Sequence, residues 1–169
     1  MEQLLIKRDT IAQFKQIAKT VYDDVLNQNI LEAQFQDLKP LLGDNLYYDL
    51  INNVANYSEL LLGGAYLDSG GVTHYNEGLN KCLTYYTYAR YTMFGGVTDT
   101  PFSMVQKLND QKSVPISTEF RKTMYTDNRQ MAYNIWLSVE KYLILTNNIL
   151  YQSNHCQPKT KSFKISKIS

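Results

Sequence analysis

The chain has 169 residues, of which 44% are hydrophobic and 20% charged, a composition typical of a soluble globular protein that needs no metal or disulfide to fold. No apolar run approaches the roughly 18 residues of a membrane span, and residues 1–9 lack the features of a signal peptide. Residues 1–149 hold 13 Lys and Arg against 16 Asp and Glu, whereas residues 150–169 hold four Lys and no acid. We therefore expect one domain over residues 1–150 and a distinct tail over 151–169.

Helical periodicity runs through the first third of the chain. Apolar residues recur at helical spacing over 9–21, and the polar residues at the start of this range are suited to cap a helix. A break is expected at 27–29, followed by a second helix over 30–40. Gly43 then predicts a helix end, with a further helix over 44–54.

The composition shifts to glycine between residues 60 and 78, where two glycine pairs lie seven positions apart. This spacing predicts a turn or a small hairpin. A phosphate-binding loop requires a preceding strand, a helix directly after the glycines and usually a Gly-Lys-Ser or Gly-Lys-Thr ending, none of which the segment shows.

Residues 75–94 are predicted to form the central helix. Their apolar stripe comprises Leu79, Cys82, Tyr86, Ala89 and Met93, and further aromatic residues cover the other sides. A helix that is apolar or aromatic nearly all round is covered on most sides, so we expect an all-α fold, a helical bundle around this aromatic-rich helix. We expect four residues to support the core: Tyr86, Ala89, Arg90 and Trp136.

The second half of the chain predicts two more helices and a strand. A glycine pair ends the central helix, and the run Thr-Asp-Thr-Pro signals a short helix over 102–109. The longest helical pattern begins at Ser117, extends to about Leu150 and is expected to pack along the central helix. Beyond it, residues 162–169 alternate apolar and polar side chains, which indicates an extended tail that ends in a strand without a partner nearby in the sequence.

Candidate catalytic groups are few. His74 lies in the glycine-rich segment, and His155 beside Cys156 provides at most two of the roughly four ligands of a zinc site. The adjacent carboxylates Asp23 and Asp24 point about 100° apart on a helix and cannot act together as an acid/base pair. Arg90 is expected to pair with a buried acid such as Asp99 or Glu77, to stack on an aromatic ring, or to reach the surface. We expect no enzymatic activity, no cofactor and no metal.

The order of these motifs resembles the head-to-tail connector, or adaptor, proteins of tailed bacteriophages, and is most similar to the ring proteins of crAss-like phages. The resemblance extends from about residue 5 to 169. None of the motifs is catalytic, so their order and spacing carry the resemblance, namely residues 38–50, Gly63-Gly64-Ala65-Tyr66, Tyr75, Gly78-Leu79, Tyr-Tyr-Thr-Tyr-Ala-Arg-Tyr at 85–91 and Thr100-Pro101-Phe102.

The resemblance implies a structural virion protein made in the host cytoplasm and located at the head-to-tail interface. Its subunits would form a homo-oligomeric ring, by implication a dodecamer, that binds the portal protein and neighbouring tail or ring proteins. The ring would extend the DNA channel, which brings it near the genome without specific binding, and no membrane is involved. The glycine-rich segment, with Tyr66, His74 and Tyr75, would contact a neighbouring subunit or line the channel.

The terminal strand is the expected partner-binding segment. A lone strand at a chain end is either frayed or added to the sheet edge of another molecule. The side chains expected to contact that partner are Phe163, Lys164, Ile165, Lys167 and Ile168. The alternative function is that of a small helical nucleic-acid-binding regulator that uses the basic tail, and it predicts salt-dependent binding to DNA.

Overall fold

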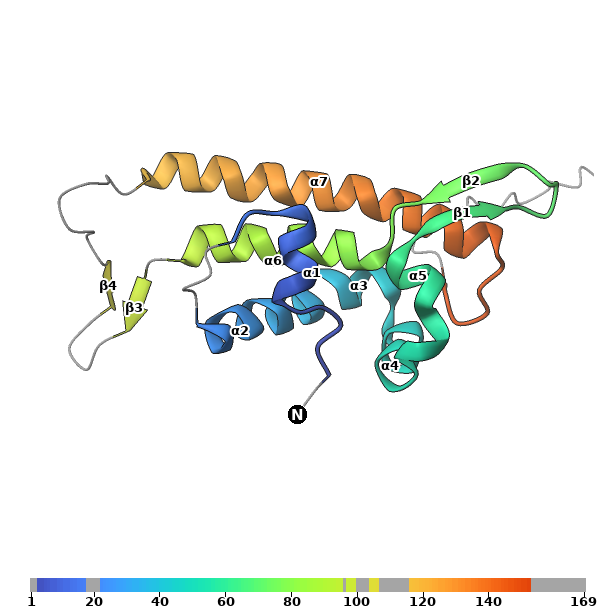
Figure 1. The fold of residues 1–169 in the computed structure, drawn as a ribbon, viewed down its shortest axis with the longest axis horizontal. Helices are drawn as coiled ribbons and strands as arrows, with labels where there is room; N and C mark the ends of the chain where they lie inside the picture. The colour runs from blue at the N-terminus through green and yellow to red at the C-terminus, as the bar shows by residue number, and fades with distance from the viewer. Residues whose placement is uncertain (1–2, 18–21, 96, 100–103, 107–115, 153–169) are drawn as a thin grey trace, which may run out of the picture.

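The computed structural model describes residues 3–17, 22–95, 97–99, 104–106 and 116–152, and these are mostly helical (Figure 1). Two long helices run side by side, and shorter elements pack beneath them or project from their ends. In chain order the elements are α1 (Arg8–Phe14), α2 (Asp23–Ala33), the π-helical turn η1 (Gln34–Leu38), α3 (Lys39–Leu42), α4 (Asp44–Asn52), the 3₁₀ turn η2 (Val54–Tyr57), α5 (Ser58–Leu62), β1 (Gly64–Leu67), β2 (Thr73–Asn76), α6 (Leu79–Phe94), β3 (Val97–Asp99), β4 (Met104–Gln106) and α7 (Thr118–Leu145).

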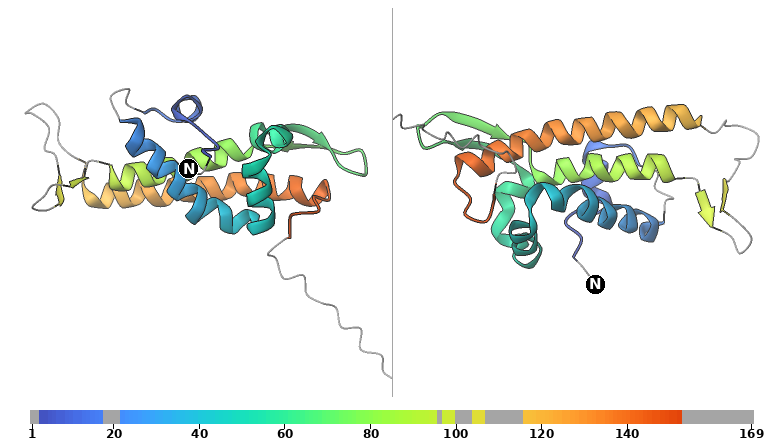
Figure 2. Two further views of the ribbon diagram at one scale, coloured as in Figure 1. Left: turned by 90° about the horizontal axis from the view of Figure 1, so that it is seen from below. Right: turned by 180° about the vertical axis from the view of Figure 1, so that it is seen from behind.

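The antiparallel pair α6 and α7 forms the axis of the molecule (Figure 1). Seen from two further directions, α2 lies against α6 on the side away from α7, and α1 crosses the flank of α6 (Figure 2). The predicted packing of the longest helix along the central one is therefore confirmed. The Ser117 hydroxyl accepts a hydrogen bond from the Phe120 amide at 3.2 Å and caps α7, which begins where the sequence pattern placed its start.

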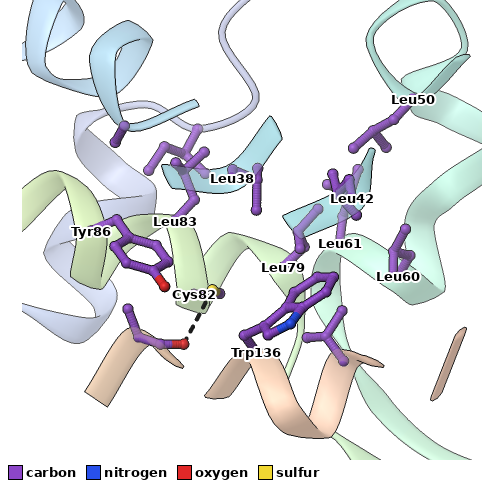
Figure 3. Close-up of a cluster of buried hydrophobic side chains, with 14 of the residues drawn as sticks. Leu38, Leu42, Leu50, Leu60, Leu61, Leu79, Cys82, Leu83, Tyr86 and Trp136 are labelled. Atoms are coloured by element: carbon purple, nitrogen blue, oxygen red, sulfur yellow. Dashed lines mark hydrogen bonds between the residues drawn. The ribbon is translucent and has the colours of Figure 1, made fainter. Parts of the chain in front are cut away.

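The core lies between α6, α7 and the helices of the first half (Figure 3). Leu79, Cys82 and Ala89 of α6 are at most 1% exposed, and Trp136 of α7 fills the same space. The Cys82 thiol donates a hydrogen bond to the Ala132 carbonyl at 3.3 Å, which shows how closely the two helices approach at these small residues. The apolar stripe predicted for the central helix is therefore buried, apart from Met93, which is half-buried.

Several predicted boundaries are wrong. Helix α2 passes through the break expected at 27–29, because the asparagines there cost a helix interior little when packing supports it. The first helix ends at Phe14, short of residue 21. The longest helix ends at Leu145, five residues before the expected end, and Asn147 follows with a positive φ of 51°.

The prediction of an all-α bundle is also wrong, because an antiparallel hairpin, β1–β2, stands in the middle of the chain and a second one, β3–β4, follows α6. The glycine-rich segment adopts the hairpin alternative. The central helix starts at Leu79, since Tyr75 belongs to β2. Residues 104–106 form a strand where a short helix was expected, and β-branched residues such as Val97, Thr98 and Val105 favour that outcome over the proline start signal.

Candidate functional site

The β1–β2 hairpin projects from one end of the helical body (Figure 1), and its base is held by hydrogen bonds between side chains and backbone groups. Asn76, 1% exposed, donates a hydrogen bond to the Glu59 carbonyl at 3.1 Å and accepts one from the Gly78 amide at 3.0 Å. The Glu77 amide donates to the Ser138 hydroxyl of α7 at 3.1 Å. The hairpin is thus fixed to both α5 and α7.

Asp68 closes the tip of the hairpin. Its Oδ1 accepts hydrogen bonds from the amides of Gly70 and Val72, each at 2.9 Å, and its Oδ2 lies 2.9 Å from Nε2 of His74. The His74 contact and the amide hydrogen bonds lower the pKa of the Asp68 carboxyl. This carboxylate and imidazole therefore hold a turn, a role that the sequence did not indicate for His74.

The two faces of the hairpin differ. Tyr66 pairs with His74 across the strands, and both point toward α7, where the Tyr66 ring meets Tyr142 edge-on at 4.9 Å between centroids. The opposite face carries Leu67 and Tyr75, which are 66% and 68% exposed. An amphipathic two-stranded sheet with large apolar groups on its outer face is a candidate contact surface for another protein.

A groove of about 480 Å³ lies between the β1–β2 hairpin and the C-terminal end of α7. Residues 63–67 and Asn76 form one wall, and Tyr142 of α7 forms the other together with Thr146, which follows the helix. Glu59 stands in the groove, where its Oε2 accepts a hydrogen bond from the Tyr142 hydroxyl at 3.2 Å. The Tyr66 hydroxyl is buried here without a hydrogen-bond partner among the described residues.

A buried ionic cluster joins η1, α6 and α7. The Asp37 side chain, 2% exposed, accepts a hydrogen bond at 2.8 Å from Nε of Arg90 and a second from Arg129. Arg90 also lies 3.6 Å from Glu32. The Arg129 guanidinium lies 5.4 Å from the ring centres of Tyr86 and Tyr125. Because its charges are paired, we interpret this cluster as structural.

Two further titratable groups are held in their neutral forms. Burial raises the pKa of the Cys82 thiol well above its usual value, so at neutral pH it is a poor nucleophile. Burial, followed by the hydrogen bond to Asp49, raises the pKa of Tyr57 to about 12. Within the described ranges, no group of three or more His, Cys, Asp or Glu side chains is placed to hold a metal ion, and no helix is both long and apolar enough to cross a membrane.

The structure places the predicted site residues in three groups. Tyr86, Ala89 and Trp136 are buried in the core, and Arg90 contacts Asp37 and Glu32 in place of Asp99 or Glu77. Tyr66, His74 and Tyr75 all lie on the β1–β2 hairpin, but only Tyr75 faces outward. The remaining predicted residues lie outside the described ones, namely His155, Cys156, Phe163, Lys164, Ile165, Lys167 and Ile168.

Sequence reasoning missed Asp37 and Arg129, which complete the ionic cluster, and Glu59 and Tyr142, which complete the groove. One signal for Asp37 was available, since it is an acid directly before Leu38 and two positions after Phe35, both apolar residues of the predicted second helix. No local pattern marks the other three, because their partners lie far away in the sequence.

Comparison with known proteins gives one match. The model of a family of unknown function, DUF6712, matches residues 38–163, a range that contains the β1–β2 hairpin, the groove, both arginines of the ionic cluster and all of α3 to α7. No curated protein and no solved structure matches the chain. Since the family model covers well over half of its residues, the chain belongs to the DUF6712 family.

Proposed function

We propose that this chain is a structural virion protein, a ring-forming head-to-tail connector subunit that joins the portal to the tail and extends the DNA channel. The observation that carries the proposal is the projecting hairpin with Leu67 and Tyr75 exposed on its outer face. The motif order described for residues 38–102 supports the connector assignment, and the hairpin supplies a surface through which copies can join.

A projecting hairpin with exposed apolar residues is an unfavourable feature in a protein that remains monomeric. An isolated two-stranded sheet is marginally stable in water, and an exposed strand edge invites pairing with other chains. The β1–β2 hairpin has both features, since β1 pairs only with β2 among the described strands. A neighbouring subunit that covers the outer face would remove apolar surface from water and stabilise the hairpin.

Helix α7 offers a second apolar surface. Tyr133, Leu137 and Ile144 are 42%, 43% and 47% exposed, and their spacing of four and seven residues places them within about 40° of one another around the helix axis. This stripe runs along the longest helix of the subunit and ends near the hairpin (Figure 1). Two apolar surfaces on one subunit fit a ring, in which each copy contacts two neighbours.

Replacing Leu67 and Tyr75 together by Asp is expected to abolish assembly of rings on the portal. Two charges placed in an apolar contact should weaken association by about 30-fold or more, which corresponds to about 2 kcal/mol. The measurement is electron microscopy and sedimentation of the chain mixed with the portal protein of the same phage.

Ile149→Asp is the matched control for this double variant. Ile149 is 95% exposed and lies outside the hairpin, so its replacement should leave both the melting temperature and assembly unchanged. If the Leu67→Asp/Tyr75→Asp variant assembles as the parent chain does, the hairpin is not the contact.

Deleting residues 158–169 is expected to leave a folded domain that no longer joins the portal or a neighbouring ring. The prediction follows from the basic, strand-like pattern of the tail. Circular dichroism should show an unchanged helical melt, and co-sedimentation with portal should be lost. Assembly that persists after the deletion would remove the tail from the proposal.

A further inference from the structure

We propose that the groove beside β1 is a strand-acceptor site, and that its occupant is the segment 162–168 of a second copy of this chain. The inference rests on the proposed ring function, since it names the contact that links neighbouring copies. It names the surface that the C-terminal tail would bind, which the sequence pattern alone does not identify.

The groove has the backbone chemistry that strand addition requires. In an antiparallel pair, alternate residues of an edge strand direct their N–H and C=O groups away from the partner strand. On β1 these groups point away from β2, and the residues from Gly63 to Leu67 line the groove. The first residues of this wall are glycines, so an incoming backbone meets no side chain there. Main-chain hydrogen bonds would provide the affinity.

The side chains in the groove fit the composition of the segment. The rings of Tyr66 and Tyr142 form an apolar patch, against which Phe163 and Ile165 would pack from one side of an added strand. The unpartnered Tyr66 hydroxyl supplies a buried polar group that an incoming strand can satisfy. The tail carries four Lys and no acid, and Glu59 in the groove provides a carboxylate of opposite charge.

The side on which the chain leaves α7 favours occupation of the groove by the tail of a second copy over occupation by the chain's own tail. Tyr151 packs on Trp136 with ring centres 6.1 Å apart and donates a hydrogen bond to Glu140 at 2.7 Å. Residues 140 and 142 point about 200° apart around a helix. Tyr151 is therefore anchored on the face of α7 away from the groove, which Tyr142 lines. Residues 152–161 span up to about 35 Å when extended, enough to reach a neighbour.

The test is disulfide cross-linking between full-length chains in a Cys156→Ser background. One chain carries Ala65→Cys on the outer face of β1, and the other carries a cysteine at position 163, 164, 165 or 166 in turn. With Phe163 and Ile165 turned inward, positions 164 and 166 lie beside residue 65. Mild oxidation of equal mixtures should give covalent dimers with Lys164→Cys and Ser166→Cys, and these dimers should be lost with Phe163→Cys and Ile165→Cys. The remaining native thiol, Cys82, is buried and does not compete.

Lys122→Cys in place of Ala65→Cys is the matched control. It is an exposed position about 30 Å from Tyr142 along α7, and it should give no dimer. Equal cross-linking at all four tail positions, cross-linking at 163 and 165 instead, or no dimer at all would overturn the inference. So would a link that forms only within one chain, seen as a monomeric product when both cysteines are on the same molecule.

The same samples separate this inference from the proposed function. Rings that form on the portal without a 65–164 cross-link would overturn strand addition and leave the connector proposal standing. A specific 65–164 dimer in a chain that never associates with the portal would support strand addition and overturn the connector assignment.

Discussion

Asp37→Ala is expected to lower the free energy of unfolding by about 3–5 kcal/mol, because it leaves two guanidinium groups beside each other without their shared carboxylate. The Asp37 side chain is 2% exposed, and the Arg90 side chain is 14% exposed. Both arginines would have to find solvent or repel each other at the junction of η1, α6 and α7. A loss this large matches a substantial part of the stability of a typical domain.

Urea denaturation followed by circular dichroism measures this loss, and Asp23→Ala provides the control. Asp23 also forms an ion pair, with Arg8 at 2.7 Å, but its side chain is 72% exposed. Removing such a surface pair is expected to cost about 1 kcal/mol or less. Equal costs for the two substitutions would show that the Asp37 cluster is not effectively buried.

Gly78→Ala is the second substitution with a large expected effect, because the backbone at the base of the hairpin leaves no room for a methyl group. Gly78 has φ +87°, and a Cβ there would lie 2.7 Å from the Leu62 carbonyl oxygen. Gly63, between α5 and β1, lies on the other side of this close approach, and a methyl group there would meet the Asn76 carbonyl oxygen. The added methyl would push the hairpin away from α5.

Gly43→Ala isolates the effect of this close approach. Gly43 has a similar backbone conformation, with φ +77°, but nothing lies within 4 Å of the position that a methyl group would occupy there. It should cost about 1–3 kcal/mol from backbone strain alone, and Gly78→Ala should exceed it by at least about 1 kcal/mol. The comparison uses the denaturant midpoints of the two variants, and a Gly78→Ala cost no larger than that of Gly43→Ala would contradict the steric argument.

Elements whose signals are local were predictable from the sequence. The Ser117 cap, the glycine that separates α3 from α4, and the buried stripe of α6 each depend on residues within one or two helical turns. The pairing of α6 with α7 followed because two long apolar stripes must cover each other. The Thr-Asp-Thr-Pro run predicted a short helix over 102–109, and this prediction was wrong because residues 104–106 form a strand.

The ionic cluster and the groove could not be predicted from the sequence. Asp37 meets Arg90 across 53 residues and Arg129 across 92, and no local periodicity encodes such a pairing. The glycine pairs predicted a turn or hairpin, but its amphipathic faces depend on β2 lying against α7. The wall formed by Tyr142 exists only because α7 ends beside β1.

The two hairpins are attached at opposite ends of the paired helices (Figures 1 and 2). Helix α6, with 16 residues, separates them by about 24 Å, and no β1–β2 residue except Asn76 belongs to the buried part of the fold. Insertions are tolerated best where few buried contacts are disturbed. The β1–β2 hairpin can therefore lengthen, shorten or change its outer residues over evolution while the helical body keeps its packing, so any contact made by its outer face can diverge without affecting the fold.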